Sequence, residues 1–488
     1  MRQKSTRRGF LQQLSAGATA LAGLHAGARA PLFAQVTTGK WKGLPRLDGV
    51  LVFDDALCEQ MAMDLGGHSH RVPAAVLRPR SAKDVLKIVR FAHTHRLKVA
   101  MRGRGHSQYG QTLVEGGIVV DSSTLSAVKL TGPRTVDAQA GASWNAVTRA
   151  TLAHGLTPPA MGDTMTLSVG GILSAGGVSN SSHLFGAVVD NVEELDVVTG
   201  SGELVTCSPQ RNSKLFDLAL AGMGQCGLLV GARLRLTVAP RWVVRRDLDY
   251  DDLKTFLVDV RRLATEARAE HLGAYVLPRD EKGGWRFRIN IGKFCASPHE
   301  ADFPELEAGL HFKAHSDPVA VSYADYLQRE VVRNATTSAA RRQTPSRLLY
   351  VAMFVPASAS EDFVARILAT PSETAGMTRF SLYVLPTPKF TRAMLMLPRE
   401  DLALSLWLFR GVPIADESAY SEAVVTVRQL ADKMREAGGK AYPPYAPFFS
   451  GSDWEGHYGP NQWSRLTAGK KAFDPGGVLT PGTGMFGP

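Results

Sequence analysis

MRGRGHSQYGQ, residues 101–111, is the most informative stretch of this 488-residue sequence. Gly103 and Gly105 lack side chains, so the backbone here can approach an anion closely, and Arg104 and Ser107 can add donors. The stretch is not the G-x-G-x-x-G fingerprint of a dinucleotide-binding βαβ unit, because neither the third glycine nor the following acidic residue is at the required spacing. Taken alone, it is more typical of a simple tight turn.

A second glycine-rich stretch, GDTMTLSVGGILSAGG, occupies residues 162–177, about 60 residues further along the chain. Its glycines, with Ser168 and Ser174, could wrap a pyrophosphate, and Asp163 places a lone carboxylate beside them. A glycine-rich turn with a solvated aspartate is the simpler alternative, but two such loops in one chain favour a binding function. A third cluster, FDPGGVLTPG at residues 473–482, would by itself indicate an ordinary chain end.

The composition is that of a folded globular protein, with 44% hydrophobic and 21% charged residues. It excludes a disordered or collagen-like chain, and the length predicts two to three domains. The 47 glycines are more than an ordinary enzyme carries, which indicates tight turns or a backbone lying close to a ligand.

The basic charge of the chain is concentrated at its start. The formal net charge is +11, but five of the basic residues and no acidic residue lie within residues 1–30. Residues 5–11, STRRGFL, resemble a twin-arginine export signal; an apolar stretch follows, and ARA at residues 28–30 resembles a cleavage site. The apolar stretch is shorter than the ~20 residues that cross a bilayer, so we expect twin-arginine export to the periplasm or medium and no membrane span in the mature protein. The rest of the chain carries only +6 and has no polybasic patch, which argues against nucleic acid as a partner.

Helical and strand patterns alternate up to Pro240, which is typical of an α/β arrangement. We expect strands at residues 98–101, 118–121, 192–198, 203–207 and 233–238, and helices at 144–154, at 212–221 and after a capping box of Ser81 and Asp84. Beyond Pro240, runs at residues 348–355, 380–385 and 402–409 predict an antiparallel sheet, covered by helices such as 421–437. The tail from Tyr442 has little periodicity, so we expect it to be irregular but packed on the protein.

Several other chemistries are not supported by the sequence. The four cysteines are scattered without zinc spacing, and we expect free thiols because the chain folds before export. The histidine pairs at 68/70 and 93/95 have no accompanying Cys or Glu cluster, so no metal site is predicted. A G-x-S-x-G motif is absent, which argues against a serine hydrolase.

Eight landmarks follow one another in a fixed order over about 420 residues. They are PAAVLRP at 73–79, the loop 103–111, 163–171, 191–200, 215–227, YADYLQR at 323–329, WEGHYGPNQWSR at 454–465, and 473–486. Together they resemble the flavoprotein oxidases with the vanillyl-alcohol-oxidase-type FAD fold, and within that group the cytokinin dehydrogenases. The resemblance implies an α+β fold: a PCMH-type FAD-binding domain of two α/β subdomains (31–240), a substrate domain with an antiparallel sheet covered by helices (241–437), and a C-terminal segment (438–488) returning to the FAD domain.

The same resemblance assigns the cofactor site. In that family the histidine of G-R-G-H-S is bonded to the 8α-methyl group of FAD, and His106 stands at that position. A single covalent bond is implied, because no second-site cysteine is present. The residues implied to line FAD are Met101, Gly103, Arg104, Gly105, Ser107, Gln111, Ser168, Ser174, Val178, Leu229, Tyr442, Thr480 and Thr483.

Asp163 corresponds to the aspartate that takes a proton from the substrate nitrogen while hydride leaves the adjacent carbon. A carboxylate there could also stabilise the positive charge that develops on the substrate. The family's purine-holding glutamate is expected near Gly273, and Glu270, three residues away on a strand, would point to the other face. This departure leaves the natural substrate open.

The sequence therefore predicts an exported FAD-dependent oxidoreductase that acts on the C–N bond of a small-molecule amine. Oxygen or a quinone would accept the electrons. An alcohol or sugar oxidase of the same fold, and a periplasmic flavin- or ligand-binding protein without turnover, are the alternatives.

Overall fold

The computed structural model describes residues 39–278, 284–331 and 345–487. By their contacts, Leu47–Pro488 form one unit and Met1–Arg46 another; the described part of the latter holds a 3-10 turn, Gly39–Trp41. The predicted export signal at residues 1–30 lies outside the described residues. Among the described helices, none is both long enough and apolar enough to cross a membrane.

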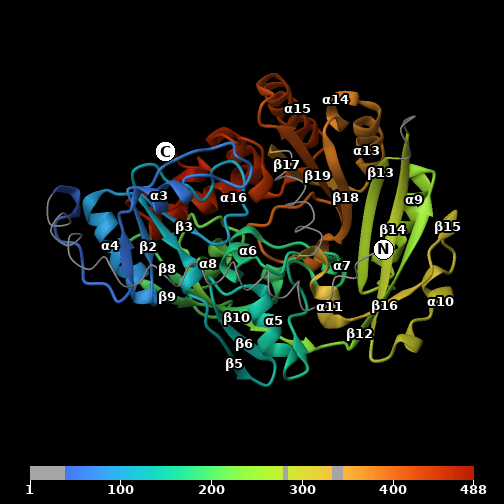
Figure 1. Ribbon diagram of the computed structural model, residues 1–488, viewed down its shortest axis with the longest axis horizontal. Helices are drawn as coiled ribbons and strands as arrows, with labels where there is room; N and C mark the ends of the chain where they lie inside the picture. The colour runs from blue at the N-terminus through green and yellow to red at the C-terminus, as the bar shows by residue number, and fades with distance from the viewer. Residues whose placement is uncertain (1–38, 279–283, 332–344, 488) are drawn as a thin grey trace, which may run out of the picture. The chain divides into compact units, whose positions relative to one another are not determined.

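The first sheet carries the loop of residues 103–111 at one end. Its order is β1-β2-β4-β3, with β2, β3 and β4 parallel and β1 antiparallel. The strands are β1 (Val50–Val52), β2 (Ala75–Arg78), β3 (Val99–Arg102) and β4 (Ile118–Asp121). Parallel neighbours need a crossover, and helix α4 (Ala82–His95) supplies it, burying the predicted apolar side of the helix. Residues 103–111 follow directly from the carboxyl end of β3, which Figure 1 labels.

The capping box predicted for α4 is wrong. Ser81 is the N-cap residue, but its side chain makes no cap hydrogen bond. Asp84 is fully buried and accepts hydrogen bonds from the backbone amides of Asp48 (2.8 Å), Gly49 (2.9 Å) and Arg80 (2.9 Å). Three amide donors stabilise the buried carboxylate better than one N-cap amide would, so Asp84 ties the segment before β1 to α4.

The second sheet is antiparallel, with order β5-β6-β10-β8-β9. Its strands are β5 (Val128–Gly132), β6 (Thr135–Gln139), β8 (Val192–Val198), β9 (Leu204–Cys207) and β10 (Leu228–Arg235). The hairpin predicted between β8 and β9 is confirmed, whereas the strand predicted at 233–238 is the end of the longer β10 followed by β11 (Thr237–Val238), which pairs with β7 (Leu156–Thr157). The helices of this region are α5 (Trp144–Leu152), α6 (Val169–Ala175), α7 (Ser182–Phe185) and α8 (Ser213–Ala219).

The predicted antiparallel sheet after Pro240 is confirmed and is larger than the sequence indicated. Its order is β15-β12-β14-β13-β18-β19-β17-β20, with β16 beside β12. The strands are β12 (Trp242–Tyr250), β13 (His271–Pro278), β14 (Trp285–Cys295), β15 (Ala314–His315), β16 (Val319–Ser322), β17 (Ser346–Pro356), β18 (Met377–Pro386), β19 (Leu402–Pro413) and β20 (Lys440–Ala441). Helices α9 (Leu253–Thr265), α13 (Ser360–Ala369) and α15 (Glu417–Glu436) accompany it (Figure 1).

The two faces of this large sheet differ. Strand register places one row of side chains, Phe287, Val276, Phe380, Leu408 and Val351, on the same face. All are buried, and Phe256 of α9 stacks on Phe287 at 5.3 Å, so this face is the one covered by helices. Because successive residues of a strand point to opposite faces, their neighbours lie on the other face.

The tail is not irregular, contrary to the sequence-based expectation. Helix α16 (Gly451–Phe473) occupies half of it, with a kink at Gly459, whose φ is +70°, just before Pro460. Glycines and a proline masked this helix, because both disfavour helix interiors. Beyond α16 the chain does pack on the protein: Val99 of β3 donates to the carbonyl of Val478 (2.9 Å) and accepts from the amide of Thr480 (2.8 Å).

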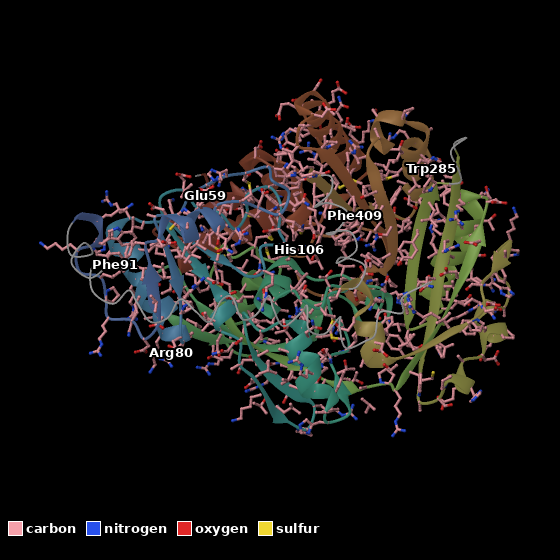
Figure 2. The ribbon with its side chains drawn as sticks, viewed as in Figure 1. Glu59, Arg80, Phe91, His106, Trp285 and Phe409 are labelled. Carbon is pink, nitrogen blue, oxygen red and sulfur yellow. The ribbon has the colours of Figure 1, made fainter. Side chains whose placement is uncertain are left out.

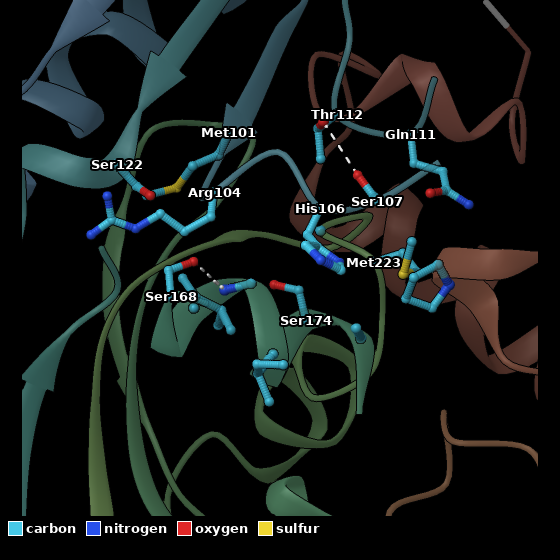
Figure 3. Close-up of a pocket in the computed structure, with 18 of the residues that line it drawn as sticks. Met101, Arg104, His106, Ser107, Gln111, Thr112, Ser122, Ser168, Ser174 and Met223 are labelled. Carbon is cyan, nitrogen blue, oxygen red and sulfur yellow. Dashed lines mark hydrogen bonds between the residues drawn. The ribbon is translucent and has the colours of Figure 1, made fainter. Parts of the chain in front are cut away.

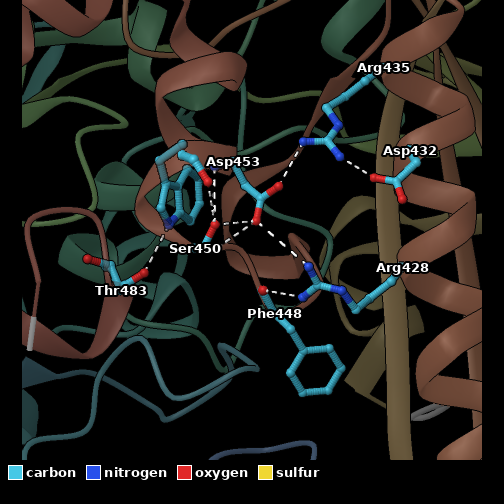
Figure 4. A network of polar contacts seen from close by, with 9 residues as sticks. Arg428, Asp432, Arg435, Phe448, Ser450, Asp453 and Thr483 are labelled. Carbon is cyan, nitrogen blue, oxygen red and sulfur yellow. Dashed lines mark hydrogen bonds and ion pairs between the residues drawn. The ribbon is translucent and has the colours of Figure 1, made fainter.

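The start of α16 is fixed by polar contacts (Figure 4). Ser450 caps the helix, and Asp453 accepts the amide of Ser450 at 2.8 Å in a capping box. Asp453 also pairs with Arg435 (2.8 Å) and Arg428 (3.9 Å) of α15. Trp454 donates from Nε1 to the carbonyl of Thr483 at 2.9 Å, which ties the last turn of the chain to this helix.

The four cysteines are free and buried, as predicted. Burial raises the pKa of Cys207 and of Cys226 to about 12, which keeps both thiols protonated and unreactive.

Candidate functional site

A cavity lies where the carboxyl end of β3 meets α6, β10 and the C-terminal segment. It holds about 990 Å³ of atom-free space, part of which is open to solvent. Five segments supply most of its wall, within residues 101–112, 167–175, 223–229, 442–445 and at Thr480. Figure 3 shows His106 in this wall, with Ser168 and Ser174 across from it.

Most residues that the sequence assigns to FAD meet in this cavity. Those that line it are Met101, Gly103, Arg104, Gly105, His106, Ser107, Gln111, Ser168, Ser174, Leu229, Tyr442 and Thr480. Val178 and Thr483 are buried but do not line it. Thr483 instead accepts a hydrogen bond from Gln225 Nε2 at 3.0 Å. The structure thus joins the three glycine-rich stretches, although they are far apart in the sequence.

In the described part of the chain, the loop after β3 has backbone amides that donate to no backbone carbonyl. The amides of Arg104, Gly105 and His106 donate to no backbone carbonyl among the described residues. Gly105 has a φ of +65°, which L side chains rarely adopt and which can turn successive amides toward one point. A Cβ at position 103 would overlap Ser168 Oγ, so the two loops can touch only because Gly103 is glycine. Such a cradle suits an anionic oxygen, as in a pyrophosphate.

Gln111 offers the opposite kind of group. Its Nε2 donates to the carbonyl of Pro443 at 2.8 Å, whereas its buried Oε1 has no hydrogen-bond partner among the described residues. A buried acceptor is costly without a donor, and a ligand N–H in this cavity would supply one. A molecule with both anionic oxygens and ring N–H donors fits this cavity, and FAD has both.

His106 is held as a neutral imidazole. Burial lowers its pKa below the ordinary value, so the ring carries no charge near neutral pH. Its Nδ1 lies 3.1 Å from the hydroxyl of Tyr445, which orients the ring. A neutral imidazole keeps a lone pair on one nitrogen, and a bond from histidine to a flavin methyl carbon requires that lone pair.

Asp163 lies in the loop before α6 and is surrounded by donors. Its carboxylate is bonded by Arg329, by the hydroxyl of Tyr383 (3.1 Å) and by Asn180 Nδ2 (3.4 Å). The side chains of Asp163 and Arg329 are only 17% and 14% exposed. The guanidinium of Arg329 also lies 4.0 Å from the ring centre of Tyr326. Three separate segments therefore fix this one carboxylate.

The Asp163–Arg329 contact is an ion pair. Burial lowers the pKa of the Arg329 guanidinium, but its contacts with Tyr326 and Asp163 outweigh burial and raise it. The arginine therefore stays protonated, and loss of either partner would leave the other charge buried and uncompensated.

The opposite face of the large sheet carries a row of large aromatic side chains. Cross-strand register places Tyr275, Trp407 and, one pair further along, Phe409 and Tyr350 on this face. All four are only half-buried, although they belong to inner strands. Tyr445, in contact with His106, lies 5.5 Å from Trp407 and 6.1 Å from Tyr350. We name this face, with these four residues, the aromatic face; Tyr445 both lines the cavity and contacts this face, and Figure 2 labels His106 and Phe409.

Gly273 and Glu270 differ in their surroundings. Glu270 bonds Lys293 (3.2 Å) and the amide of Phe294 (3.0 Å), so its carboxylate is occupied by β14. Gly273 lies on β13, where an added Cβ would be 3.2 Å from Asn180 Oδ1. No carboxylate of the segment 270–274 reaches the donors around Asp163.

Sequence reasoning missed the partners of the two central residues. Tyr445, Tyr383 and Asn180 carry no local motif that marks them. Arg329 could have been found, because it ends the YADYLQR landmark.

Two families match this chain. The profile described as "FAD binding domain" matches residues 73–208, which include β2 to β9 and the loops around His106 and Asp163. The profile described as "Cytokinin dehydrogenase 1, FAD and cytokinin binding" matches residues 300–486. Both matches agree with the fit of the cavity to FAD.

Relatives match over nearly their whole length. An uncharacterized oxidoreductase, ORF5 in the fasciation locus of Rhodococcoides fascians, is 32% identical, with 90% of this chain and 99% of that protein aligned. Cytokinin dehydrogenase 4 of Oryza sativa subsp. japonica is 30% identical, with 91% of each chain aligned. The crystal structure of 6-hydroxy-D-nicotine oxidase from Arthrobacter nicotinovorans shares the fold, with a TM-score of 0.68 at 19% identity over 89% of this chain and 96% of that one. The chain is an FAD-dependent oxidoreductase and belongs to the cytokinin dehydrogenase family.

Proposed function

We propose that this enzyme oxidises the C–N bond of an amine and that Asp163 receives the proton from the substrate nitrogen. The observation that carries the proposal is the fixed position of Asp163, bonded by Arg329, Tyr383 and Asn180. The residue before it, Gly162, lies against Ile172 of the cavity wall. Asp163 therefore lies one residue from the cavity wall, and its partner Tyr383 lies 6.0 Å from Trp407 of the aromatic face.

When bound, FAD supplies the hydride acceptor. Loss of hydride from the carbon beside the nitrogen leaves positive charge on the substrate, and the Asp163 carboxylate stabilises that charge and takes the N–H proton. Tyr383 and Asn180 donate to the two carboxylate oxygens and so restrict how the group can rotate. The half-buried rings of the aromatic face would exclude water and hold a flat substrate.

A cytokinin-like secondary amine is the first substrate class to test, because relatives of 30% identity carry that name. Gly273 argues for breadth in the panel, since no carboxylate stands at that position.

We also propose that the protein is exported through the twin-arginine route and carries FAD bonded to His106. A covalent bond would retain the cofactor in a compartment where FAD cannot be reloaded. The basic, twin-arginine start of the chain and the neutral imidazole of His106 support this proposal.

Anaerobic flavin bleaching tests the reaction. The purified yellow protein is mixed with secondary amines and with alcohols and sugars of similar size, and absorbance near 450 nm is followed. We expect amines to bleach the flavin. Bleaching by alcohols or sugars alone would overturn the amine assignment in favour of an alcohol or sugar oxidase.

A further inference from the structure

Arg379 is a charged residue on the aromatic face whose side chain has few hydrogen-bond partners among the described residues. It lies on β18 and pairs across the strand with Phe409, so it faces the same side as the aromatic rings. Its guanidinium is 5.1 Å from the ring centre of Phe409 and 5.8 Å from that of Tyr275. Its side chain is 26% exposed. A partly exposed cation therefore lies between two rings of the aromatic face.

The guanidinium of Arg379 has more N–H donors than acceptors in the described structure around it. It has five N–H donors, and its nearest acid, Glu330, is 3.7 Å away, beyond hydrogen-bond distance. Its buried Nε has no hydrogen-bond partner among the described residues. Arg410, on the neighbouring strand, shows the ordinary case, since it donates to the carbonyls of Ser372 (3.0 Å) and Glu373 (2.6 Å).

A second unmet donor lies beside it. Ser381 is two residues further along β18 and points to the same face, where it pairs with Tyr275 and Trp407. Its buried Oγ has no hydrogen-bond partner among the described residues. Within the described part of the chain, Arg379 and Ser381 thus both carry a donor without an acceptor on the aromatic face. Buried donors without acceptors are costly.

We propose that Arg379 and Ser381 form a subsite for an anionic group of the substrate. This inference rests on the proposed amine oxidation and names its substrate class: an amine whose aromatic part carries a carboxylate or a similar planar oxyanion. The fork of an arginine matches a carboxylate in a bidentate pair. The rings of Phe409 and Tyr275 lie on either side of the guanidinium. The aromatic part of the substrate would stack on the neighbouring rings of the same face.

The charges of the site are consistent with this substrate. Asp163 pairs with Arg329, and Glu330 lies 3.7 Å from Arg379. As hydride leaves, positive charge develops beside Asp163 while the anionic group lies at Arg379, so each substrate charge has an opposite charge beside it.

Binding of a carboxylate that cannot be oxidised tests the subsite without turnover. Calorimetry on the flavin-loaded protein compares 2-naphthoate with 2-naphthamide, which has the same shape and no charge. We expect the wild-type protein to bind naphthoate at least ~10-fold more tightly. Arg379→Met should weaken naphthoate binding ~10- to 100-fold and leave the amide unchanged. Arg379→Lys, which keeps the charge but not the fork, should fall between them.

Arg366→Met is the matched control, because Arg366 also lies over a phenylalanine, Phe363 at 5.3 Å, but on helix α13. It should bind both ligands as the wild type does. Equal affinity for naphthoate and naphthamide in the wild type, or an unchanged preference in Arg379→Met, overturns the subsite. Should Arg379→Met fail to fold, the wild-type preference and Arg379→Lys still decide.

Flavin bleaching separates this inference from the proposed function. Bleaching by amines with no preference for those carrying a carboxylate overturns the subsite alone. Selective naphthoate binding in a protein that no amine bleaches overturns the amine oxidation alone.

Discussion

Asp163 is the residue on which the proposed chemistry depends. Asp163→Asn keeps the size of the side chain and its contact with Arg329 but removes the proton-accepting oxygen. We expect flavin binding to be unchanged and the rate of flavin reduction by substrate to fall ~10²-fold or more, as removal of a general base does. Stopped-flow absorbance under anaerobic conditions measures both.

Asp137→Asn is the matched control for that experiment. Asp137 also pairs with an arginine, Arg233, through two bonds of 2.8 and 2.9 Å, but it does not line the cavity. It should reduce flavin at the wild-type rate. Equal rates in Asp163→Asn and the wild type would remove Asp163 from the proton transfer.

His106 carries the second prediction at this scale. After acid precipitation, the wild-type pellet should remain yellow, because flavin bonded to the imidazole cannot leave the denatured chain. The pellet of His106→Ala should be colourless, while His154→Ala, at an exposed histidine, should behave as the wild type. Yellow colour in the wild-type supernatant rather than the pellet would contradict a covalent bond.

The sequence identified residues of this site where the signal is local. Gly103, Gly105 and Ser168 lie in short motifs that the family resemblance assigns to FAD, although the loop 103–111 taken alone is more typical of a simple tight turn. Tyr383 and Arg329 were not assigned, since they reach Asp163 across 220 and 166 residues of sequence. Only the folded sheet determines that the tyrosine of β18 arrives there, whereas Arg329 ends the YADYLQR landmark and could have been proposed.

Elements with a clear apolar period were also predictable. Helix α4 and strands such as β8 and β19 alternate or repeat as their geometry requires, so their positions were right within a few residues. Helix α16 was missed because Gly456, Gly459 and Pro460 interrupt its pattern. Its stability comes from its capped start and its packing, and neither is a periodic signal.

Asp453 therefore deserves a test at the start of α16. Asp453→Ala removes the capping box with Ser450 and both contacts with α15, and we expect it to cost about 1–2 kcal/mol in the free energy of unfolding. Asp432→Ala is the control, because Asp432 pairs with the same Arg435 but is 54% exposed, so its loss should cost about 0.5 kcal/mol or less. Urea titration measures both.

The pH dependence of Asp453→Ala adds a second check. Burial raises the pKa of Asp453, but hydrogen bonds from Ser450 and Arg435 outweigh burial and lower it. A carboxylate with a lowered pKa stabilises the fold above its unfolded value of about 4 and loses that effect as the pH falls. The difference between wild type and Asp453→Ala should therefore shrink below pH 4; a difference that stays constant would mean that the charge is not responsible.

At the scale of the whole molecule, buried histidines tie its stability to pH. Burial lowers the pKa of His68, His106, His183, His271 and His457. These rings sit in the FAD lobe, at the large sheet and in α16, so the effect is spread over the unit Leu47–Pro488. In the unfolded chain each histidine binds a proton near pH 6.5, whereas in the folded chain each remains neutral to lower pH. Stability must fall as the pH drops below about 6.5.

His183 allows this to be measured. Its pKa is lowered to about 4 by burial, and its Nε2 lies 2.7 Å from the carbonyl of Ala269. Between pH 7.5 and 5.0 it should account for roughly 2 kcal/mol of lost stability, since the unfolded chain is protonated there and the folded ring is not. His183→Gln can keep the bond to Ala269 and cannot be protonated, so its unfolding free energy should change by about that much less over the same interval. A stability that is equal at both pH values in the wild type, or an equal loss in His183→Gln, would show that this ring is protonated as readily in the folded protein as in the unfolded chain.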